Sequence, residues 1–250
     1  MKVFKISRVG QIKTRREINL SKTIGILGGM GPSATVDLFN KIISNTPAIS
    51  DQDHLHIIIN NNPKIPPRMN ALNPGSESPL PELIKGAQIL QKAGADFIIM
   101  PCNTAHIWYQ EISDSITIPF YNMITNAVDH TLNQINGSNS TVLLLATHTT
   151  IHTRLYQKAF QETAVTLIIP SHTEQIMVNE AISSVKGGLL KTNPYLKAFN
   201  KMLDDYANQG VMHILGGCSE LPLLFPFLNE KIDKLDPTLM LAQLAVSKGL

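Results

Sequence analysis

The stretch FIIMPCNT, residues 97–104, has a counterpart later in the chain in HILGGCSE, residues 213–220. In both stretches a short apolar run leads into a cysteine, and residues suited to the start of a helix follow it. A glycine stands eight positions before each cysteine, at Gly94 and Gly210, where it is suited to end a preceding helix. The match predicts one strand-turn-helix unit used twice, with a thiol at the same place in each copy.

Apolar runs alternate with helical patterns along the rest of the chain. Runs typical of parallel strands cover residues 23–28, 55–59, 96–100, 116–119, 142–146, 165–169 and 211–215. Helical spacing covers residues 34–43, 83–90, 104–112, 122–135, 151–162, 173–185, 194–208 and 237–248. The alternation predicts an α/β fold of two similar domains, each a parallel sheet flanked by helices. Ligands of such sheets bind at the carboxyl ends of strands, where both cysteines fall, so we expect the functional cleft between the domains.

The repeat also suggests how the chain divides. We expect residues 1–22 to be a basic N-terminal arm that is poorly ordered. Residues 23–120 together with 225–250 form the predicted first α/β domain, which carries Cys102. Residues 121–224 form the predicted second α/β domain, which carries Cys218.

Composition excludes several classes of protein. The 250 residues are 43% hydrophobic and 16% charged, which is ordinary for a globular protein, and no apolar stretch approaches the ~20 residues of a membrane span. Two cysteines make no disulfide framework, which favours the cytoplasm. The net charge is +2, but residues 1–22 hold seven basic residues and one acidic residue, so the remainder is near −4. We therefore expect neither a nucleic-acid partner nor a membrane partner.

The two cysteines carry the clearest chemical signal. Thiols on opposite sides of a substrate can remove a proton from one face of a carbon and return one to the other face, which is racemase chemistry without a cofactor. A helix N-terminus near each thiol lowers its pKa and favours the thiolate. A single buried cysteine is more often an ordinary core residue. Two cysteines in matched turns favour the functional interpretation.

Three other positions have two interpretations each. Met30 lies in the turn GGMGPS, residues 28–33, whose backbone N–H groups can hold a small anion, although a plain tight turn explains the spacing as well. Arg68 lies in the proline-rich loop 60–81 and is a natural bidentate partner for a carboxylate, or a solvated surface arginine. Lys186 is either a similar ligand for an anion or a cation favoured at a helix end.

The histidines suggest a metal site only weakly. The stretch DQDHLH, residues 51–56, holds four possible ligands, and His148 and His152 are four positions apart. Neither set has a spacing known for zinc with cysteine, so we expect no metal. His106 either orients groups near Cys102 or closes the first turn of the following helix.

Taken together, these motifs resemble the aspartate racemase branch of the aspartate/glutamate racemase superfamily. The matching segments lie in order over residues 23–230: GGMGPSAT (28–35), DQDH (51–54), NNPKIPPR (61–68), PCNTAH (101–106), LATHTT (145–150), Pro170 with Glu174-Gln175, Lys186-Gly187 and GCSELPLL (217–224).

The resemblance implies a function and a set of site residues. It implies a homodimer that interconverts L- and D-aspartate, a small-molecule substrate, with no cofactor and with Cys102 and Cys218 as the two acid/base groups. Asn103 and Thr104 would hold the α-carboxylate, and Arg68 and Lys186 the side-chain carboxylate. The full set of substrate-binding residues expected is Met30, Arg68, Asn103, Thr104, Thr147, Thr150, Lys186, Ser219 and Glu220.

Departures from the family pattern leave alternatives open. Glu220 stands where glutamate racemases usually have histidine, which favours the aspartate branch. Pro67 replaces an aspartate, and Thr149 and Arg154 replace glycine or another small residue, so the substrate preference can differ. The alternatives are a glutamate or broad-specificity amino-acid racemase on the same scaffold, and a non-catalytic amino-acid-binding protein.

Overall fold

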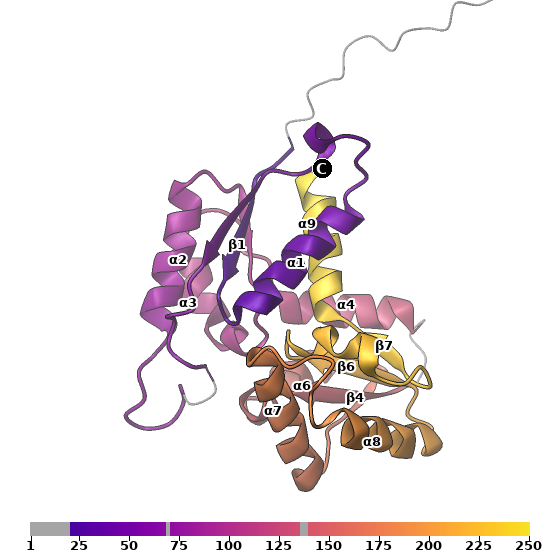
Figure 1. The fold of residues 1–250 in the computed structure, drawn as a ribbon. Coiled ribbons are helices and arrows are strands. Elements are labelled where there is room, and N and C mark those ends of the chain that lie inside the picture. Colours follow the sequence, from indigo (N-terminus) through magenta and orange to yellow (C-terminus); the bar gives the residue numbers. More distant parts are fainter. Residues whose placement is uncertain (1–20, 69–70, 136–139) are drawn as a thin grey trace, which may run out of the picture.

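A computed structural model describes residues 21–68, 71–135 and 140–250 and contains two parallel sheets (Figure 1). The first sheet has the strand order β2-β1-β3, with β1 at Ile24–Gly28, β2 at Ile57–Asn61 and β3 at Phe97–Ile99. The second sheet has the order β5-β4-β6-β7, built from β4 (Thr141–Ala146), β5 (Thr166–Ile168), β6 (His213–Gly217) and β7 (Asp233–Leu235). Every pair of neighbouring strands is parallel. The predicted α/β fold with two parallel sheets flanked by helices is confirmed.

Helices connect and cover these strands. The α-helices of the described residues are α1 (Pro32–Asn45), α2 (Leu80–Lys92), α3 (Tyr109–Asp114), α4 (Met123–Gln134), α5 (His148–His152), α6 (Leu155–Ala159), α7 (His172–Lys186), α8 (Leu196–Asn208) and α9 (Pro237–Gly249). Short 3₁₀ turns lie at Asp51–Asp53, Thr104–Trp108, Leu221–Leu223 and Phe225–Phe227. Strand β1 is buried along its whole length, as expected of a central parallel strand covered on both faces.

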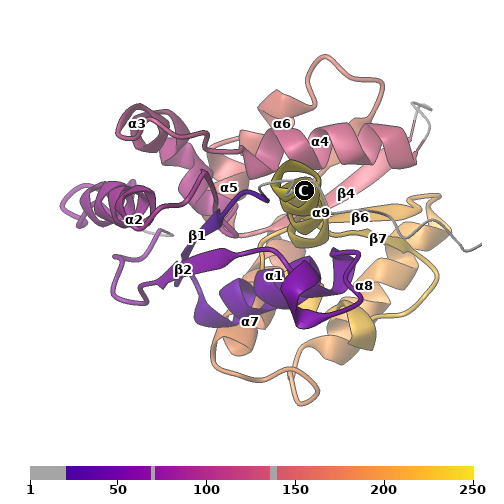
Figure 2. The ribbon, with the colours of Figure 1, turned by 90° about the horizontal axis from the view of Figure 1, so that it is seen from above.

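Helix α9 lies between α1 and α4 (Figure 2). Its buried residues extend around most of the helix, whereas Gln243, Ser247 and Lys248 are exposed. The carboxylate of Asp236 caps the helix by accepting hydrogen bonds from the N–H groups of Thr238 and Leu239. The same carboxylate lies 2.7 Å from Nζ of Lys41 on α1. This ion pair ties the start of α9 to α1.

Several predicted elements differ from those observed. The strand expected at 55–59 is shifted to Ile57–Asn61, and the one expected at 116–119 is reduced to a single bridge between Ile98 and Phe120. The helix expected at 151–162 divides into α5 and α6, because Arg154 between them has a left-handed backbone with φ 58°. The glycine or small residue common in the family suits that conformation better than arginine does.

Strand β7 was not expected, because its three residues carry no apolar alternation. It extends the second sheet beside β6, whereas α9, directly after it, packs against α1 of the first sheet. The segment 225–250 thus contributes to both sheets. The predicted N-terminal arm lies outside the described residues except at its end, where Lys22 donates a backbone hydrogen bond to Gly249.

The turn after β1 requires glycine for two separate reasons. Gly29 has φ +98°, and a Cβ atom on it would lie 2.4 Å from the backbone of Asn62. Gly94 has a nearly equal φ of +95°, but a Cβ there would meet nothing within 4 Å. Comparing a substitution at Gly94 with one at Gly29 therefore distinguishes the cost of the left-handed backbone from the cost of steric overlap.

We expect Gly29→Ala to be much more destabilising than Gly94→Ala. The left-handed backbone alone costs alanine about 1–2 kcal/mol, which is the loss expected at position 94. At position 29 the overlap with a neighbouring backbone adds about 1–3 kcal/mol. Urea unfolding of the two variants measures the difference, and equal losses of unfolding free energy would contradict the crowded turn.

Candidate active site

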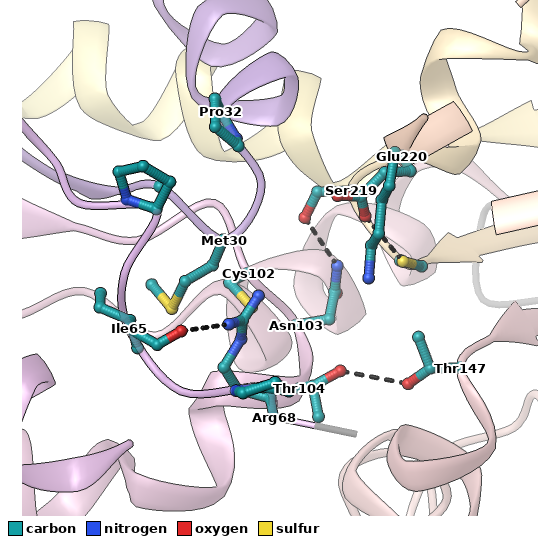
Figure 3. Close-up of a pocket in the computed structure, with 15 residues that line it drawn as sticks. Met30, Pro32, Ile65, Arg68, Cys102, Asn103, Thr104, Thr147, Ser219 and Glu220 are labelled. Atoms are coloured by element: carbon teal, nitrogen blue, oxygen red, sulfur yellow. Dashed lines mark hydrogen bonds between the residues drawn. The ribbon is translucent and has the colours of Figure 1, made fainter. Parts of the chain in front are cut away.

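A cavity of about 280 Å³ lies between the two sheets, at the carboxyl ends of β1, β3, β4 and β6 (Figure 3). Both halves of the chain contribute to its wall. The lining residues are Gly29, Met30, Pro32, Pro63, Ile65, Pro67, Arg68, Cys102, Asn103, Thr104, Thr147, Lys186, Cys218, Ser219 and Glu220. Both cysteines are free thiols and are buried, so the two matched turns present their thiols to one cavity.

His106 holds the turn that carries Cys102. Its Nε2 accepts a hydrogen bond from the backbone N–H of Met123 at 3.0 Å, and its Nδ1 lies 2.9 Å from the carbonyl oxygen of Cys102. Since Nε2 accepts, the proton of the neutral ring is on Nδ1, which donates to Cys102. Burial lowers the pKa of His106 to about 4, so the ring is neutral at pH 7. Of the two roles suggested by the sequence, this geometry favours orientation of the thiol turn.

Three threonine hydroxyls form a buried triangle between the halves. Thr104 begins the 3₁₀ turn after Cys102, and its hydroxyl lies 3.2 Å from that of Thr147 and 2.8 Å from that of Thr150. The hydroxyls of Thr147 and Thr150 are 3.0 Å apart, and Thr147 also caps α5 by accepting from the N–H of Thr150. Thr104 and Thr147 line the cavity, whereas Thr150 supports them from behind.

Asn103 joins the two cysteine turns directly. Its Nδ2 donates to Oγ of Ser219 at 3.2 Å, and Ser219 follows Cys218 (Figure 3). Its Oδ1 accepts from the hydroxyl of Tyr156 at 2.5 Å. Asn103 and Ser219 are each 2% exposed, so their polar atoms depend on these partners and on whatever enters the cavity.

Glu220 is a carboxylate buried beside the second thiol. Oε2 of Glu220 accepts from Sγ of Cys218 at 3.0 Å, and Oε1 accepts from the backbone N–H of Gly31 at 3.1 Å. Gly31 is the N-cap of α1 and has no side chain, so Glu220 satisfies one of the unpaired N–H groups at this helix start. Burial and the neighbouring Glu220 carboxylate raise the pKa of Cys218 well above its ordinary value, and Lys186 opposes this shift. Cys218 is therefore a thiol in the free protein.

Two cations, Arg68 and Lys186, also line the cavity. The guanidinium of Arg68 is held by its own loop, because Nη1 donates to the carbonyl oxygens of Ile65 and Pro66 at 3.3 and 3.1 Å. Its Nε is buried and has no hydrogen-bond partner within the described structure. Lys186, the last residue of α7, contributes the second cation.

The cavity contains all the expected site residues except Thr150, which lies directly behind it. Sequence reasoning missed the apolar part of the wall, namely Pro32, Pro63, Ile65 and Pro67, although it singled out the loop that holds three of them. It also missed Tyr156, which was only one position in an expected helix. No sequence signal distinguishes it from a core aromatic residue.

The described residues contain neither a cluster of metal ligands nor a helix that could span a membrane. Over these residues, no three or more histidine, cysteine, aspartate or glutamate side chains are grouped so as to hold a metal ion. Asp53 instead caps the backbone at Ser50, and the rings of His148 and His152 stack on each other. No helix in the described part of the chain has both the length and the apolar character needed to cross a membrane.

The chain also matches a known protein family. The family model for Asp/Glu/hydantoin racemases matches residues 27–245. The chain belongs to this family. Membership supports an amino-acid racemase and confirms the resemblance seen in the sequence.

Relatives within the family differ in the substrate that their names give. This racemase-family chain is 29% identical over 232 residues to the broad-specificity amino-acid racemase RacX of Bacillus subtilis, covering 91% of this chain and 98% of RacX. The solved structure of Picrophilus torridus aspartate racemase is 31% identical, with a TM-score of 0.78, and the match covers 91% of this chain and 94% of that one. Glutamate racemase from Campylobacter jejuni shares the fold at 17% identity and a TM-score of 0.59, over 89% and 84% of the two chains.

The neutral His106 predicts a specific acid sensitivity. The unfolded chain binds a proton at histidine's ordinary pKa of 6.5, whereas the folded site resists it until about pH 4. Between these values the unfolded state holds more protons, so the free energy of unfolding falls as the pH drops, by about 3 kcal/mol in total.

Urea unfolding at several pH values between 4 and 7 measures this slope. His106→Gln removes the titrating ring, so it should lower stability at pH 7 but flatten the dependence below 6.5. His172→Gln, at an exposed position at the start of α7, is the matched control. An unchanged slope in His106→Gln would show that His106 is not the source.

Proposed function

We propose that this protein is a cofactor-independent racemase that interconverts L- and D-aspartate by a two-cysteine, two-base mechanism. The observation that carries the proposal is that Cys102 and Cys218, from two copies of one strand-turn unit, line the same cavity. The cavity also brings together hydrogen-bond donors and two cations, Arg68 and Lys186, which suits a substrate with two carboxylates.

Each turnover needs two proton transfers. One cysteine, as thiolate, takes the α-proton, so the Cα–H bond breaks and an S–H bond forms. The electron pair left on Cα delocalises into the α-carboxylate. The other cysteine, as thiol, then gives its proton to the opposite face of Cα, and the configuration at Cα is inverted. After the reaction the cysteine that began as thiolate is a thiol, and the other is a thiolate. The enzyme is then in the protonation state that the reverse reaction needs.

The raised pKa of Cys218 gives the free protein a preferred starting state. With Cys218 protonated, Cys102 is the group that acts as base on the first enantiomer bound. When the reaction runs the other way, Cys218 is the thiolate that the preceding turnover left and Cys102 is the thiol. Burial and the Glu220 carboxylate 3.0 Å away raise the pKa of Cys218, which makes its thiolate a stronger base. The carboxylate therefore serves the second thiol without touching Cα.

Donors around the cavity suit the α-carboxylate. Asn103, Thr104 and Ser219 lie at the starts of the turns that follow β3 and β6, where backbone N–H groups are free of helical partners. Held in place before the substrate arrives, such donors stabilise the negative charge that develops on the carboxylate in the transition state. Arg68 and Lys186 would bind the side-chain carboxylate.

A broad-specificity amino-acid racemase is the second candidate. It is favoured by Pro67, which places an apolar ring in the cavity wall where the family commonly has an aspartate beside the arginine. The similarity to RacX over nearly its whole length supports the same alternative.

Incubation with single enantiomers in deuterated water tests the function. We expect deuterium to enter at Cα of aspartate as the other enantiomer appears, without added cofactor. Exchange across many amino acids would support the broad-specificity candidate, exchange in glutamate alone the glutamate racemase, and no exchange in any amino acid a binding role.

Cys102→Ser and Cys218→Ser should each abolish racemisation, with losses of at least about 10³-fold, since a serine hydroxyl is far less acidic than a thiol. Thermal unfolding of the same variants confirms that they remain folded. Turnover like that of the wild type in either variant would refute the two-thiol mechanism.

The role of Glu220 predicts a change in the pH profile. Glu220→Gln keeps the shape of the side chain but removes the charge that raises the pKa of Cys218. The limb of kcat/KM that belongs to Cys218 should move to lower pH with either enantiomer: the alkaline limb where Cys218 is the acid, and the acidic limb where it is the base. Glu180→Gln, on the exposed face of α7, is the control. If that limb stays at the same pH in Glu220→Gln, Glu220 does not determine the pKa of Cys218.

A further inference from the structure

Tyr156 lies directly behind the cavity and contacts both cysteine turns. It is fully buried in α6, and its hydroxyl donates to Oδ1 of Asn103 in the first turn. Its ring lies under the second turn, since a Cβ atom added to Gly217 would lie 3.2 Å from the ring carbon Cε2. Glycine before Cys218 therefore leaves room for the ring, and for Leu144 and Ala146, which lie closer still. Tyr156 is not among the residues that line the cavity.

The hydrogen bond from Tyr156 determines which way the Asn103 amide points. An asparagine side chain can place either its oxygen or its nitrogen toward a given neighbour, and the choice depends on the surrounding donors. Burial raises the pKa of Tyr156 far above the working range, so the hydroxyl keeps its proton. It therefore donates to Oδ1, and Nδ2 is turned toward Ser219.

The orientation of Asn103 in turn determines what Ser219 can do. Oγ of Ser219 accepts from Nδ2 of Asn103, so the proton of Ser219 is left to be donated elsewhere. Ser219 lines the cavity beside Cys218, where that proton is available to an anionic ligand. If Asn103 were reversed, Oδ1 would accept the Ser219 proton and this donor would be lost.

We propose that Tyr156 is a positioning residue for the α-carboxylate site: through Asn103 it keeps the Ser219 hydroxyl as a donor to the substrate. The proposal rests on the racemase function proposed above and names the group that orients its carboxylate-binding donors. The interaction chain Tyr156–Asn103–Ser219 crosses from one half of the molecule to the other and back.

A double-mutant cycle tests the chain. Tyr156→Phe keeps the ring that fills the space under Gly217 and removes only the hydroxyl. We expect kcat/KM for aspartate to fall roughly tenfold, the size expected for one hydrogen bond to a charged group. Ser219→Ala should cause a similar loss, and the double variant should lose little more than either single variant, because both changes remove the same donor.

Independent contributions would instead multiply to about a hundredfold loss in the double variant, which would overturn the proposal. So would Tyr156→Phe with a lowered melting temperature and unchanged kcat/KM, since that is the behaviour of a packing residue. Tyr206→Phe is the matched control, because its hydroxyl donates to Glu174 outside the cavity and its loss should leave kcat/KM unchanged.

The same four proteins of the cycle are also compared by calorimetric binding of L-aspartate and of its α-carboxamide. Tyr156→Phe should weaken binding of aspartate about tenfold and bind the carboxamide as the wild type does, since the amide lacks the anion. A wild-type protein that binds aspartate without racemising any amino acid contradicts the proposed function alone, and the binding cycle still decides the role of Tyr156. A wild-type protein that neither binds nor racemises any amino acid contradicts both.

Discussion

The structure depends on hydrogen bonds that cross between the two sheets at the ends of their strands. Asn103 bonds to Ser219, Thr104 to the Thr147–Thr150 pair, and the N–H of Gly31 to Glu220. These polar groups are buried or partly buried, so leaving any of them without a hydrogen bond would cost free energy. The contacts therefore fix the two halves in one relative position and, with them, the positions of both cysteine turns. A cavity that must place two acid/base groups around one carbon needs this constraint.

The two thiols are chemically unequal although their sequence settings match. Cys102 is held through its backbone by a neutral histidine, whereas Cys218 shares its proton with a buried carboxylate. The difference arises at two positions of the repeat. Glu220 stands in the second turn where the first has Thr104, and Pro222 stands where the first has His106. A duplicated backbone unit thus carries both thiols, while burial and the neighbouring Glu220 carboxylate raise the pKa of Cys218.

Much of the fold and the site was predictable because both rest on local signals. Buried parallel strands form continuous apolar runs, and the cysteine motifs mark the ends of two of them. The α/β fold and the lining residues of the two cysteine turns therefore followed from Phe97–Thr104 and His213–Glu220. The parts that were not predictable depend on tertiary context. The break at Arg154 needs a backbone conformation that its own sequence does not favour, and β7 forms only because β6 offers a free edge. Tyr156 matters through a bond to a residue 53 positions away, which no local pattern contains.

Helix α9 has a consequence for how the chain assembles. It fills the space between α1 and α4, yet it follows every strand of the second sheet in the chain. Ribosomes add about 5–20 residues per second, so α1 emerges on the order of ten seconds before the helix that covers it. Through that interval the part of α1 that packs on α9 lacks its native partner and is open to chaperones or to other nascent chains. The first sheet is thus the first to be synthesised and the last to be completed.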